Sequence, residues 1–395
     1  MNNNALQGVR VLDFTWLLAG PYATRTLADF GAEVIKIQTK KMATGTESNA
    51  TGYFNTWNRN KLGITLNLSH SEGRELVLKL VKMSDVIVEN FTPRVMANWG
   101  LSYDTLKEVK PDIIMVSLSG MGQTGPWRDF SALGPTIQAL SGITHLTSSG
   151  HGSPEGIGYS YADPLAGMFA AFAILAALEY RTMTGKGLYL DMSEYEAAGC
   201  LLGPAFLDYS VNHNLTIPKG NADDDTTAAP HGCYRCRGED RWSVIAVFTE
   251  EEWQALCRVM GNPAWTKQER FLSLSQRREH IEELNQLIER WTVNHTPEQV
   301  MTMLQEARVP AGVVNNAADL ANDPQLKSRD FFMQTQHPAL GKTRFDSTPI
   351  RLSNTPARFQ KAAPLLGQDN SYVYRDLLGL DEEQFRQHVE QGIIT

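Results

Sequence analysis

Short runs of β-branched and other apolar residues alternate with helix-type patterns through the first half of the chain. Parallel strands need a crossover connection, which is usually an α-helix. Helix-type spacing of apolar residues occupies 22–30, 72–83 and 164–180. The alternation therefore predicts a doubly wound, mostly parallel α/β sheet of Rossmann-like type over roughly residues 1–200. The expected buried strands are 9–14, 33–37, 85–88, 112–118 and 188–192.

The chain changes character at residues 214–230, where Asp223, Asp224 and Asp225 stand among Gly, Thr and Ala. Such a stretch is typical of an exposed linker, and 395 residues are enough for two or three structural units. We therefore expect a large domain whose N-terminal part spans 1–213, a linker at 214–230, a smaller α+β domain at 231–329, and a C-terminal part at 330–395 that returns to the large domain. In the small domain we expect a strand at 242–248 and helices at 250–260, 277–292 and 297–307.

Charge and composition exclude several classes of protein. The 36 basic and 44 acidic residues give a formal net charge of −8, which argues against a protein that lives on nucleic acid or an anionic membrane. The longest apolar stretch, Leu165–Leu178, is shorter than the roughly 20 residues that span a bilayer. Residues 1–7 lack the order of a secretory signal, and four cysteines are too few for a disulfide framework. We expect a soluble protein of the cytoplasm.

Two short motifs suggest a cofactor or a metal, but their context does not support either. Residues 120–125 match G-x-G-x-x-G after an expected strand, yet no helix opens on the third glycine and no acidic residue follows at the distance a ribose would need. A glycine-rich loop over a ligand, or a tight turn, fits better. Cys233 and Cys236 form a CxxC without a second CxxC or a close pair of histidines. We expect neither a metal site nor a tightly bound cofactor.

The most informative local pattern is the helix start at Asp163, which Pro164 follows before a long apolar helix. Proline is favoured at the first helical position, so Asp163 is expected at the N-cap. A plain capping role explains an aspartate there without any further purpose. The same geometry suits a nucleophile, because the helix dipole keeps the carboxylate ionised and free amides nearby can bind an oxyanion. Ala162, Ala166 and Gly167 would leave room for a substrate to reach it.

Several separated segments agree, in order, with one known family. They are residues 6–14, 20–21, 27–37, 58–61, 88–91, 119–126, 138–142, 184–187, 230–232, 309–311 and 364–367. Each segment alone is a weak signal. Together they resemble the class III CoA-transferases, of the formyl-CoA transferase and carnitine CoA-transferase type, over most of the chain.

The resemblance implies an acyl-CoA:carboxylate CoA-transferase in which Asp163 is the nucleophile. Its carboxylate would attack the thioester of a donor acyl-CoA and give a mixed anhydride, then an aspartyl-CoA thioester, which a small organic acid would resolve. Coenzyme A is then a co-substrate, and an interlaced dimer is expected, either a homodimer or a heteromer with a homologous subunit. Gly120, Gly122 and Gln123 are expected to form an active-site loop. The residues expected to bind CoA are Leu18, Ala19, Leu66, Asn67, Ser69, Asn90, Phe91, Thr92 and Arg94.

Departures from the formyl-CoA transferase pattern bear on the acid that reacts. Leu18 stands where that enzyme has a glutamine near the nucleophile, and Thr39 replaces a basic CoA contact. Leu133 or Gly134, depending on a small gap, stands where it has a tyrosine. We therefore expect a less polar pocket and a larger acid, aromatic or aliphatic.

Two alternatives stay open at this point. The α-methylacyl-CoA racemases of the same superfamily exchange a proton with a His and an Asp, and Leu133 occupies the position of that His. A noncatalytic CoA-binding subunit of a heteromeric transferase is the other alternative, against which the presence of Asp163 argues. The sequence identifies neither the donor nor the acceptor acid.

Overall fold

The chain divides into two compact units, each of which is described by itself. The computed structural model describes residues 4–41, 43–149, 154–218, 220 and 227–395. The first unit consists of Met1–His145, Gly156–Thr216 and Leu326–Thr395, and the second of Leu146–Glu155 and Ile217–Gln325. The predicted linker, 214–230, includes residues 219 and 221–226, which lie outside the described residues. Leu146–Glu155 belongs to the second unit, although the predicted large domain included it.

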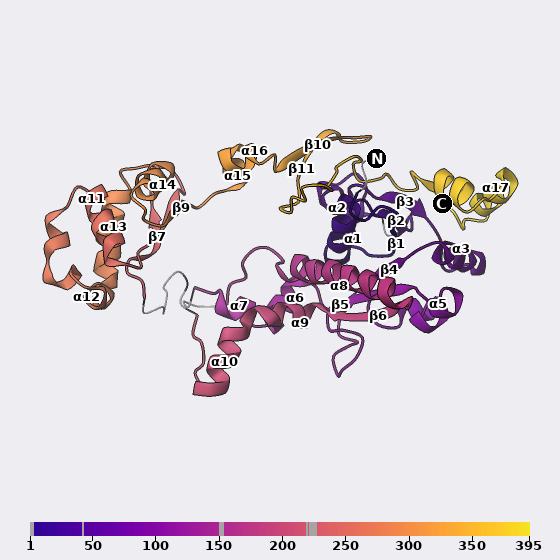
Figure 1. Ribbon diagram of the computed structural model, residues 1–395, viewed down its shortest axis with the longest axis horizontal. Coiled ribbons are helices and arrows are strands. Elements are labelled where there is room, and N and C mark those ends of the chain that lie inside the picture. The colour runs from indigo at the N-terminus through magenta and orange to yellow at the C-terminus, as the bar shows by residue number, and fades with distance from the viewer. Residues whose placement is uncertain (1–3, 42, 150–153, 219, 221–226) are drawn as a thin grey trace. The chain divides into compact units, whose positions relative to one another are not determined.

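A six-stranded, fully parallel sheet forms the centre of the first unit (Figure 1). Its strands are β1 (Arg10–Asp13), β2 (Glu33–Gln38), β3 (Leu62–Thr65), β4 (Val86–Glu89), β5 (Ile114–Ser119) and β6 (Leu188–Ser193). Their order across the sheet is β3-β2-β1-β4-β5-β6, with every neighbouring pair parallel. Successive side chains point to opposite faces, so Val11 and Leu12 enter two different cores. The prediction of a doubly wound parallel sheet is confirmed.

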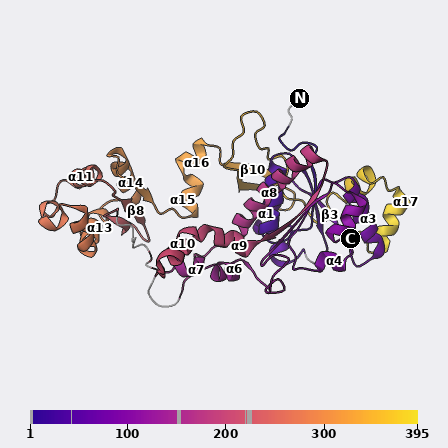
Figure 2. The same cartoon turned by 60° about the horizontal axis from the view of Figure 1, so that its bottom comes forward.

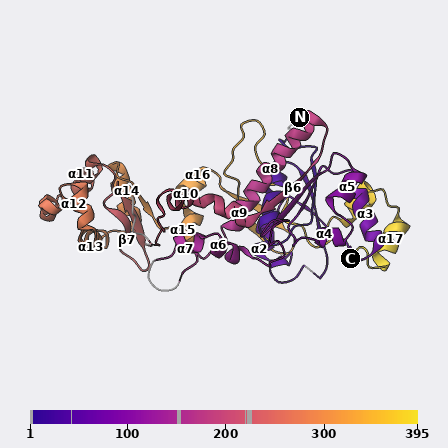
Figure 3. The ribbon, with the colours of Figure 1, turned by 90° about the horizontal axis from the view of Figure 1, so that it is seen from below.

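Helices cover both faces of this sheet (Figures 2 and 3). On one face, α1 (Ala19–Asp29) and α8 (Ala162–Thr184) pack side by side, and their buried alanines allow a close approach. On the other face lie α3 (Ser71–Lys82), α5 (Tyr103–Val109) and the C-terminal α17 (Glu382–Glu390). The C-terminal part of the chain thus returns to the sheet of the first unit.

Shorter elements connect and flank these layers. They are η1 (Gly45–Glu47), α2 (Gly52–Asn58), α4 (Val95–Asn98), α6 (Gly134–Leu140), α7 (Ile143–Leu146), α9 (Glu194–Gly199), η2 (Cys200–Leu202), α10 (Gly203–Asn212), α15 (Ala317–Asn322), α16 (Pro324–Ser328), β10 (Phe332–His337), β11 (Gly341–Asp346) and η5 (Tyr372–Leu377). Strands β10 and β11 form an antiparallel hairpin.

The sequence did not predict strand β3, which contains Gly63 in a run of only four residues. Glycine weakens the strand pattern, but here the fold requires it. A Cβ at position 63 would lie 2.7 Å from Pro364 and 3.1 Å from the carbonyl oxygen of Leu365. The Gly63 N–H donates to Asp369 Oδ2 at 2.8 Å. The returning C-terminal segment therefore crosses β3 at a point where no side chain fits.

Helix α8 is long and apolar enough to cross a membrane by length and composition alone. A core helix passes the same test, and one side of α8 packs on α1 and the sheet. Only 39% of its most apolar window is buried. The outward side carries an exposed apolar row of Met168, Phe169, Phe172 and Leu175.

The second unit combines a small antiparallel sheet with helices around its own core. The strands are β7 (His231–Arg235), β8 (Trp242–Ala246) and β9 (Ala311–Val313), in the order β7-β8-β9. The helical elements are α11 (Glu250–Val259), η3 (Ala264–Lys267), η4 (Glu269–Phe271), α12 (Leu274–Glu279), α13 (Ile281–Thr292) and α14 (Pro297–Glu306). The helix predicted at 277–292 is two helices, because His280 leaves the helical region at φ −115°.

Candidate active site

The strand order reverses between β1 and β4, and doubly wound sheets bind ligands beyond the strand ends at such a point. The segment after β1, residues 14–18, and the segment after β4, residues 90–92, meet there. Asn90 joins the two segments through its side chain. Its Oδ1 accepts the Trp16 N–H at 2.9 Å, and its Nδ2 donates to the Trp16 carbonyl oxygen at 2.9 Å. Residues 14–18 and 90–92 therefore form a fixed rim at the point where the strand order reverses.

A buried charge network supports this rim from inside the protein. Asp13, the last residue of β1, accepts hydrogen bonds from the Thr15 N–H and the Lys61 ammonium, both at 2.8 Å. The Thr24 hydroxyl donates to the same carboxylate at 2.7 Å, and Lys36 Nζ donates to the Thr15 carbonyl at 2.6 Å. Burial opposes the ionisation of Asp13, but the charges of Lys36 and Lys61 outweigh it and hold its pKa at about 2.

A cavity of about 260 Å³ opens beside the rim and contains the Asp163 carboxyl. The segments that follow β1, β4 and β5 form its walls, together with the starts of α6, α8 and α9. All of them belong to the first unit. The lining residues are Trp16, Leu17, Asn90, Phe91, Thr92, Pro93, Val95, Ser119, Gly120, Met121, Arg128, Phe130, Ala132, Leu133, Gly134, Asp163 and Glu194.

Asp163 stands in the first turn of α8 and not at its N-cap, which corrects the sequence prediction. Tyr161 already has helical angles, φ −71° and ψ −26°, so the helix begins at Ala162. The Ser160 hydroxyl donates a hydrogen bond to Asp163 Oδ2. Burial raises the pKa of Asp163, and the hydrogen bond from Ser160 lowers it in part. The ionised carboxylate is thus poorly solvated, which favours its use as a nucleophile.

Gly134, at the start of α6, leaves the space that the Asp163 and Ser160 side chains occupy. A Cβ at position 134 would overlap the Ser160 hydroxyl and the Asp163 carboxylate. The Gln138 side chain of the same helix accepts the Tyr161 N–H. Helix α6 therefore determines where the start of α8 lies. Sequence reasoning treated Gly134 only as a departure from the family pattern and missed this contact.

Glu194 is a cavity residue that sequence reasoning missed. It is the first residue of α9, only 7% exposed, and it lines the same cavity as Asp163. Burial, and then the charge of Asp163, raises the pKa of Glu194 to about 8. The carboxyl is therefore mostly protonated at neutral pH. A glutamate in the first turn of a helix is ordinary, because it complements the helix dipole, so the sequence pattern offers no signal for this role.

A narrower cleft of about 80 Å³ shares two walls, Trp16 and Phe91, with the cavity. Phe91 also meets Trp99 edge to face, with ring centroids 5.3 Å apart. Four residues predicted to bind CoA line the cleft: Leu66, Asn67, Ser69 and Phe91. Three line the cavity: Asn90, Phe91 and Thr92.

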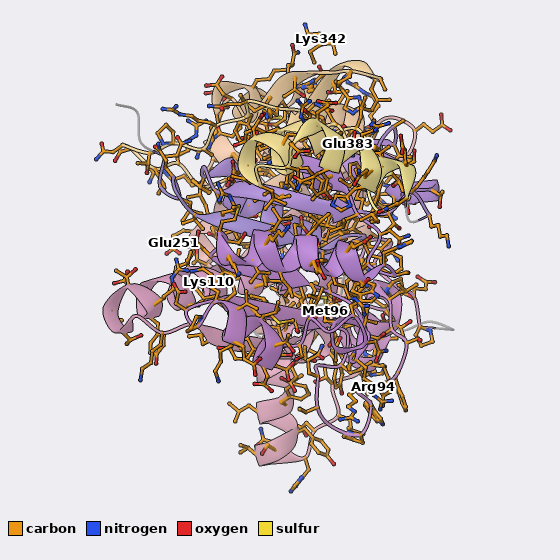
Figure 4. All side chains as sticks on the ribbon, turned by 90° about the vertical axis from the view of Figure 1, so that its right-hand side faces the viewer. Arg94, Met96, Lys110, Glu251, Lys342 and Glu383 are labelled. Carbon is orange, nitrogen blue, oxygen red and sulfur yellow. The ribbon has the colours of Figure 1, made fainter. Side chains whose placement is uncertain are left out.

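The other residues predicted to bind CoA lie elsewhere. Leu18 and Ala19 stand at the start of α1, where the residues are 4% and 1% exposed, and they line neither space. Arg94 lies on the outer surface of the first unit, where it pairs with Asp129 at 2.9 Å (Figure 4). The roles of these three residues in CoA binding stay predictions.

The predicted loop residues are divided between the cavity and its surroundings. Gly120 lines the cavity, whereas Gly122 and Gln123 do not. Gly122 has a positive φ of 81°, and the Gln123 N–H donates to Asp191 Oδ1 at 2.9 Å. Arg128, farther along the same loop, lines the cavity and was not predicted as a site residue.

Within the part of the chain that the structure describes, no group of three or more His, Cys, Asp or Glu could hold a metal ion. Cys233 and Cys236, which form the CxxC motif in the second unit, are free thiols. Burial raises the pKa of Cys236 to about 11, so it is a poor thiolate at neutral pH.

The fold and the site define a doubly wound α/β protein with a half-buried carboxyl in a cavity at the reversal point of its sheet. The chain belongs to CoA-transferase family III, whose family model matches residues 6–370, and it is a CoA-transferase.

Similar proteins cover nearly the whole chain. The succinyl-CoA–D-citramalate CoA-transferase of Chloroflexus aurantiacus is 35% identical, over 96% of this chain and 95% of its own length. The succinyl-CoA–L-malate CoA-transferase alpha subunit of Chloroflexus aurantiacus is 33% identical, over 98% of this chain and 92% of its own length. The crystal structure of a CAIB/BAIF family protein from Brucella suis superposes with a TM-score of 0.87 at 30% identity, covering 95% of this chain and 100% of that one.

Proposed function

We propose that the protein moves CoA from an acyl-CoA donor to a carboxylic acid through an aspartyl-CoA thioester at Asp163. One observation carries this proposal. The half-buried Asp163 lines a cavity at the reversal point of the sheet, and that cavity shares the walls Trp16 and Phe91 with a second cleft. A bound acyl-CoA would place its acyl group in the cavity and its CoA chain in the cleft. Its thioester would then lie between Trp16 and Phe91, with the thioester carbon facing Asp163.

The reaction is a series of acyl exchanges on one carboxyl group. The Asp163 carboxylate attacks the thioester carbon, the C–S bond breaks, and CoA leaves as a thiolate beside a mixed anhydride. The thiolate attacks the Asp163 carbonyl carbon, and the donor acid leaves as a carboxylate. An acceptor carboxylate then attacks the aspartyl-CoA thioester, and the same two steps run in reverse. Because Ser160 holds Oδ2, Oδ1 is the oxygen that we expect to attack.

Backbone and side-chain donors around the cavity would stabilise the oxyanions of these steps. Gly120 lines the cavity at the end of β5, where a backbone N–H can approach an acyl oxygen without a side chain in the way. Lys36, which lines the cleft, contributes positive charge near the polyanionic CoA. Phe91 and Trp99 offer an apolar wall to the same ligand.

The acid that reacts is proposed to carry a second carboxylate. The two relatives above are named for succinyl-CoA with citramalate and with malate, all of them derived from dicarboxylic acids. In this chain Arg128 lines the cavity that contains Asp163, and a guanidinium binds a carboxylate through two hydrogen bonds. These observations favour a dicarboxylic acid over the larger aromatic or aliphatic acid expected from the sequence.

The exposed apolar row on α8 supports assembly with a second chain, as a homodimer or with a homologous subunit. Patches of this kind mark protein interfaces. Helix α10 adds another exposed apolar face with Phe206, Leu207, Tyr209 and Val211. A relative is named as the alpha subunit of a transferase. Light scattering of the purified chain should give twice its mass, and a monomer with full activity would contradict the proposed assembly.

The covalent step is tested by the variant Asp163→Asn. We expect purified protein incubated with succinyl-CoA to gain the mass of CoA on the peptide that contains Asp163, and Asp163→Asn to lose both the adduct and transfer. The matched control is Asp104→Asn, since Asp104 is also the second residue of a helix but is exposed. Full transfer by Asp163→Asn without an adduct would exclude the mechanism.

The racemase alternative needs a base opposite Asp163, and no histidine is among the described residues that line this cavity. Leu133 lines it at the position discussed for that base. Racemase activity would appear as deuterium at the α-carbon of the acyl group without any acid acceptor. A noncatalytic subunit would bind CoA and show neither activity.

A further inference from the structure

Glu194 is placed at the cavity by the two elements on either side of it. It follows β6 directly, and the side chain of Ser193 accepts the Glu196 N–H to begin α9. The next N–H, that of Tyr195, donates to the Gly120 carbonyl at 2.9 Å, which ties the helix start to the loop after β5. The backbone at Glu194 is therefore fixed by the pairing of β6 before it and by the hydrogen bonds of Tyr195 and Glu196 after it.

Among the described residues, no cation and no hydrogen-bond donor meets the Glu194 carboxyl, and only burial and the negative charge of Asp163 act on it. The buried Asp13 differs, because the Lys61 ammonium meets it at 2.8 Å. A buried carboxylate without a cation is costly, so such a group keeps its proton. A protonated carboxyl is a hydrogen-bond donor as well as an acceptor.

Few other charges reach this carboxyl from the elements packed around α9. Helix α8 presents Asp163, β6 carries the exposed Asp191, and η2 carries the exposed thiol of Cys200. Helix α6 contains no titratable residue. Arg128, whose side chain is 45% exposed, lines the outer part of the same cavity and is close to Asp129 at 3.5 Å. The reacting acid therefore meets two carboxyl groups in the cavity, the nucleophile Asp163 and Glu194, which repel it if both are ionised.

We propose that Glu194 is a substrate-binding residue whose protonated carboxyl donates a hydrogen bond to the carboxylate of the reacting acid and holds that carboxylate beside Asp163. The ligand class is thus a carboxylate anion, bound at its reacting end. This inference rests on the proposed function. The proton stays on Glu194 throughout, so no extra acid or base is consumed.

The kinetic test compares Glu194→Gln, which keeps a neutral donor, with Glu194→Leu, which has none. Exchange of ¹³C-succinate into succinyl-CoA, followed by mass spectrometry, gives kcat and KM for the acid. We expect wild-type kcat/KM to be flat below pH 8 and to fall about tenfold per pH unit above it, because ionised Glu194 repels the acid. Glu194→Gln should stay flat, and Glu194→Leu should lose about 10- to 100-fold, mainly through KM.

The control is Glu196→Gln, an exposed glutamate on the same helix, which should keep the wild-type profile. The proposal is wrong if kcat/KM of Glu194→Gln falls above pH 8 as steeply as that of the wild type. It is also wrong if kcat/KM of Glu194→Leu stays within about threefold of wild type, because the loss of one hydrogen bond to a charged group costs more than that.

A second measurement needs no substrate. The infrared spectrum of the full chain, taken as a difference between wild type and Glu194→Gln, should show the band of a protonated carboxyl at pH 7 that is lost above pH 8. If that band is missing at pH 7, Glu194 is ionised and the inference is wrong. Wild-type exchange by Asp163→Asn would instead refute the proposed function, while the infrared result still decides the state of Glu194.

Discussion

Replacing Gly134 by alanine is the sharpest test of the Asp163 geometry, because it adds one methyl group at the point of closest approach. Gly134 does not have a positive φ, so the backbone itself accepts alanine. The new Cβ would overlap the Ser160 hydroxyl and the Asp163 carboxylate and would lie 2.7 Å from Ser160 Cβ, where ordinary contact begins at 3.4 Å. The start of α8 must therefore retreat from α6.

The size of this retreat determines the expected loss of activity. Ser160 Cβ has to move by roughly 0.7 Å, and the Asp163 carboxylate by more. A misplacement of about 1 Å at a reacting group costs about 100-fold in rate, which corresponds to about 2.7 kcal/mol of activation free energy. We expect Gly134→Ala to lower kcat by about that factor and to slow CoA adduct formation on Asp163 equally, with little change in the cleft lined by Phe91.

The assay is single-turnover formation of the adduct from succinyl-CoA, with urea unfolding measured alongside to correct for stability. The matched control is Gly199→Ala, since Gly199 also lies on a short helix at this edge and a Cβ there would meet nothing within 4 Å. If Gly134→Ala forms the adduct at the wild-type rate while remaining folded, the carboxylate does not depend on α6 and the reasoning is refuted.

Three further predictions concern charged residues. Because the folded-state pKa of Asp13 is about 2 against an ordinary 3.8, this group adds about 2 kcal/mol of stability above pH 4 that is lost as the pH falls towards 2. Asp13→Asn should remove that part of the acid sensitivity in urea titrations between pH 2 and 5. Lys61→Met leaves Asp13 buried and partly unpaired, so it should lower the free energy of unfolding by about 3–5 kcal/mol. Arg128→Gln should raise KM about tenfold for a dicarboxylic acid and leave KM unchanged for a monocarboxylic acid of equal length. An equal rise in KM for both acids would count against the guanidinium as the partner of the second carboxylate.

The sheet could be predicted because parallel strands are buried on both faces and appear as apolar runs. Five of its six strands were found, each to within two residues. β3 was missed since the close crossing of Pro364 requires Gly63, and this requirement lies about 300 positions away in the chain. The start of α8 was misplaced by two residues, because Pro164 suggests a cap before it but does not reveal that Tyr161 is already helical.

The candidate site could be predicted only in part. Asp163 has a local signal in its helix start, and the resemblance supplied Asn90, Phe91 and Thr92. Glu194 and Gly134 have no such signal, because their role depends on which elements the fold brings against α8. Periodicity and capping rules describe a residue by its neighbours in sequence, whereas a cavity wall is made by residues that are neighbours only in space.

The distribution of carboxyl groups along the sheet edge explains how an acidic chain can accept a polyanionic co-substrate. Parallel strands end at one edge, so Asp13 at the end of β1, Glu89 at the end of β4 and Glu194 after β6 gather there. Lysine ammonium groups accompany Asp13 and keep it ionised, whereas burial raises the pKa of Glu89 to about 7 and that of Glu194 to about 8. The formal charge of −8 counts both glutamates as anions. At neutral pH Glu194 is mostly protonated and Glu89 is partly protonated. The electrostatic field at the cavity is therefore less negative than the composition implies, and an anionic acid can approach Asp163.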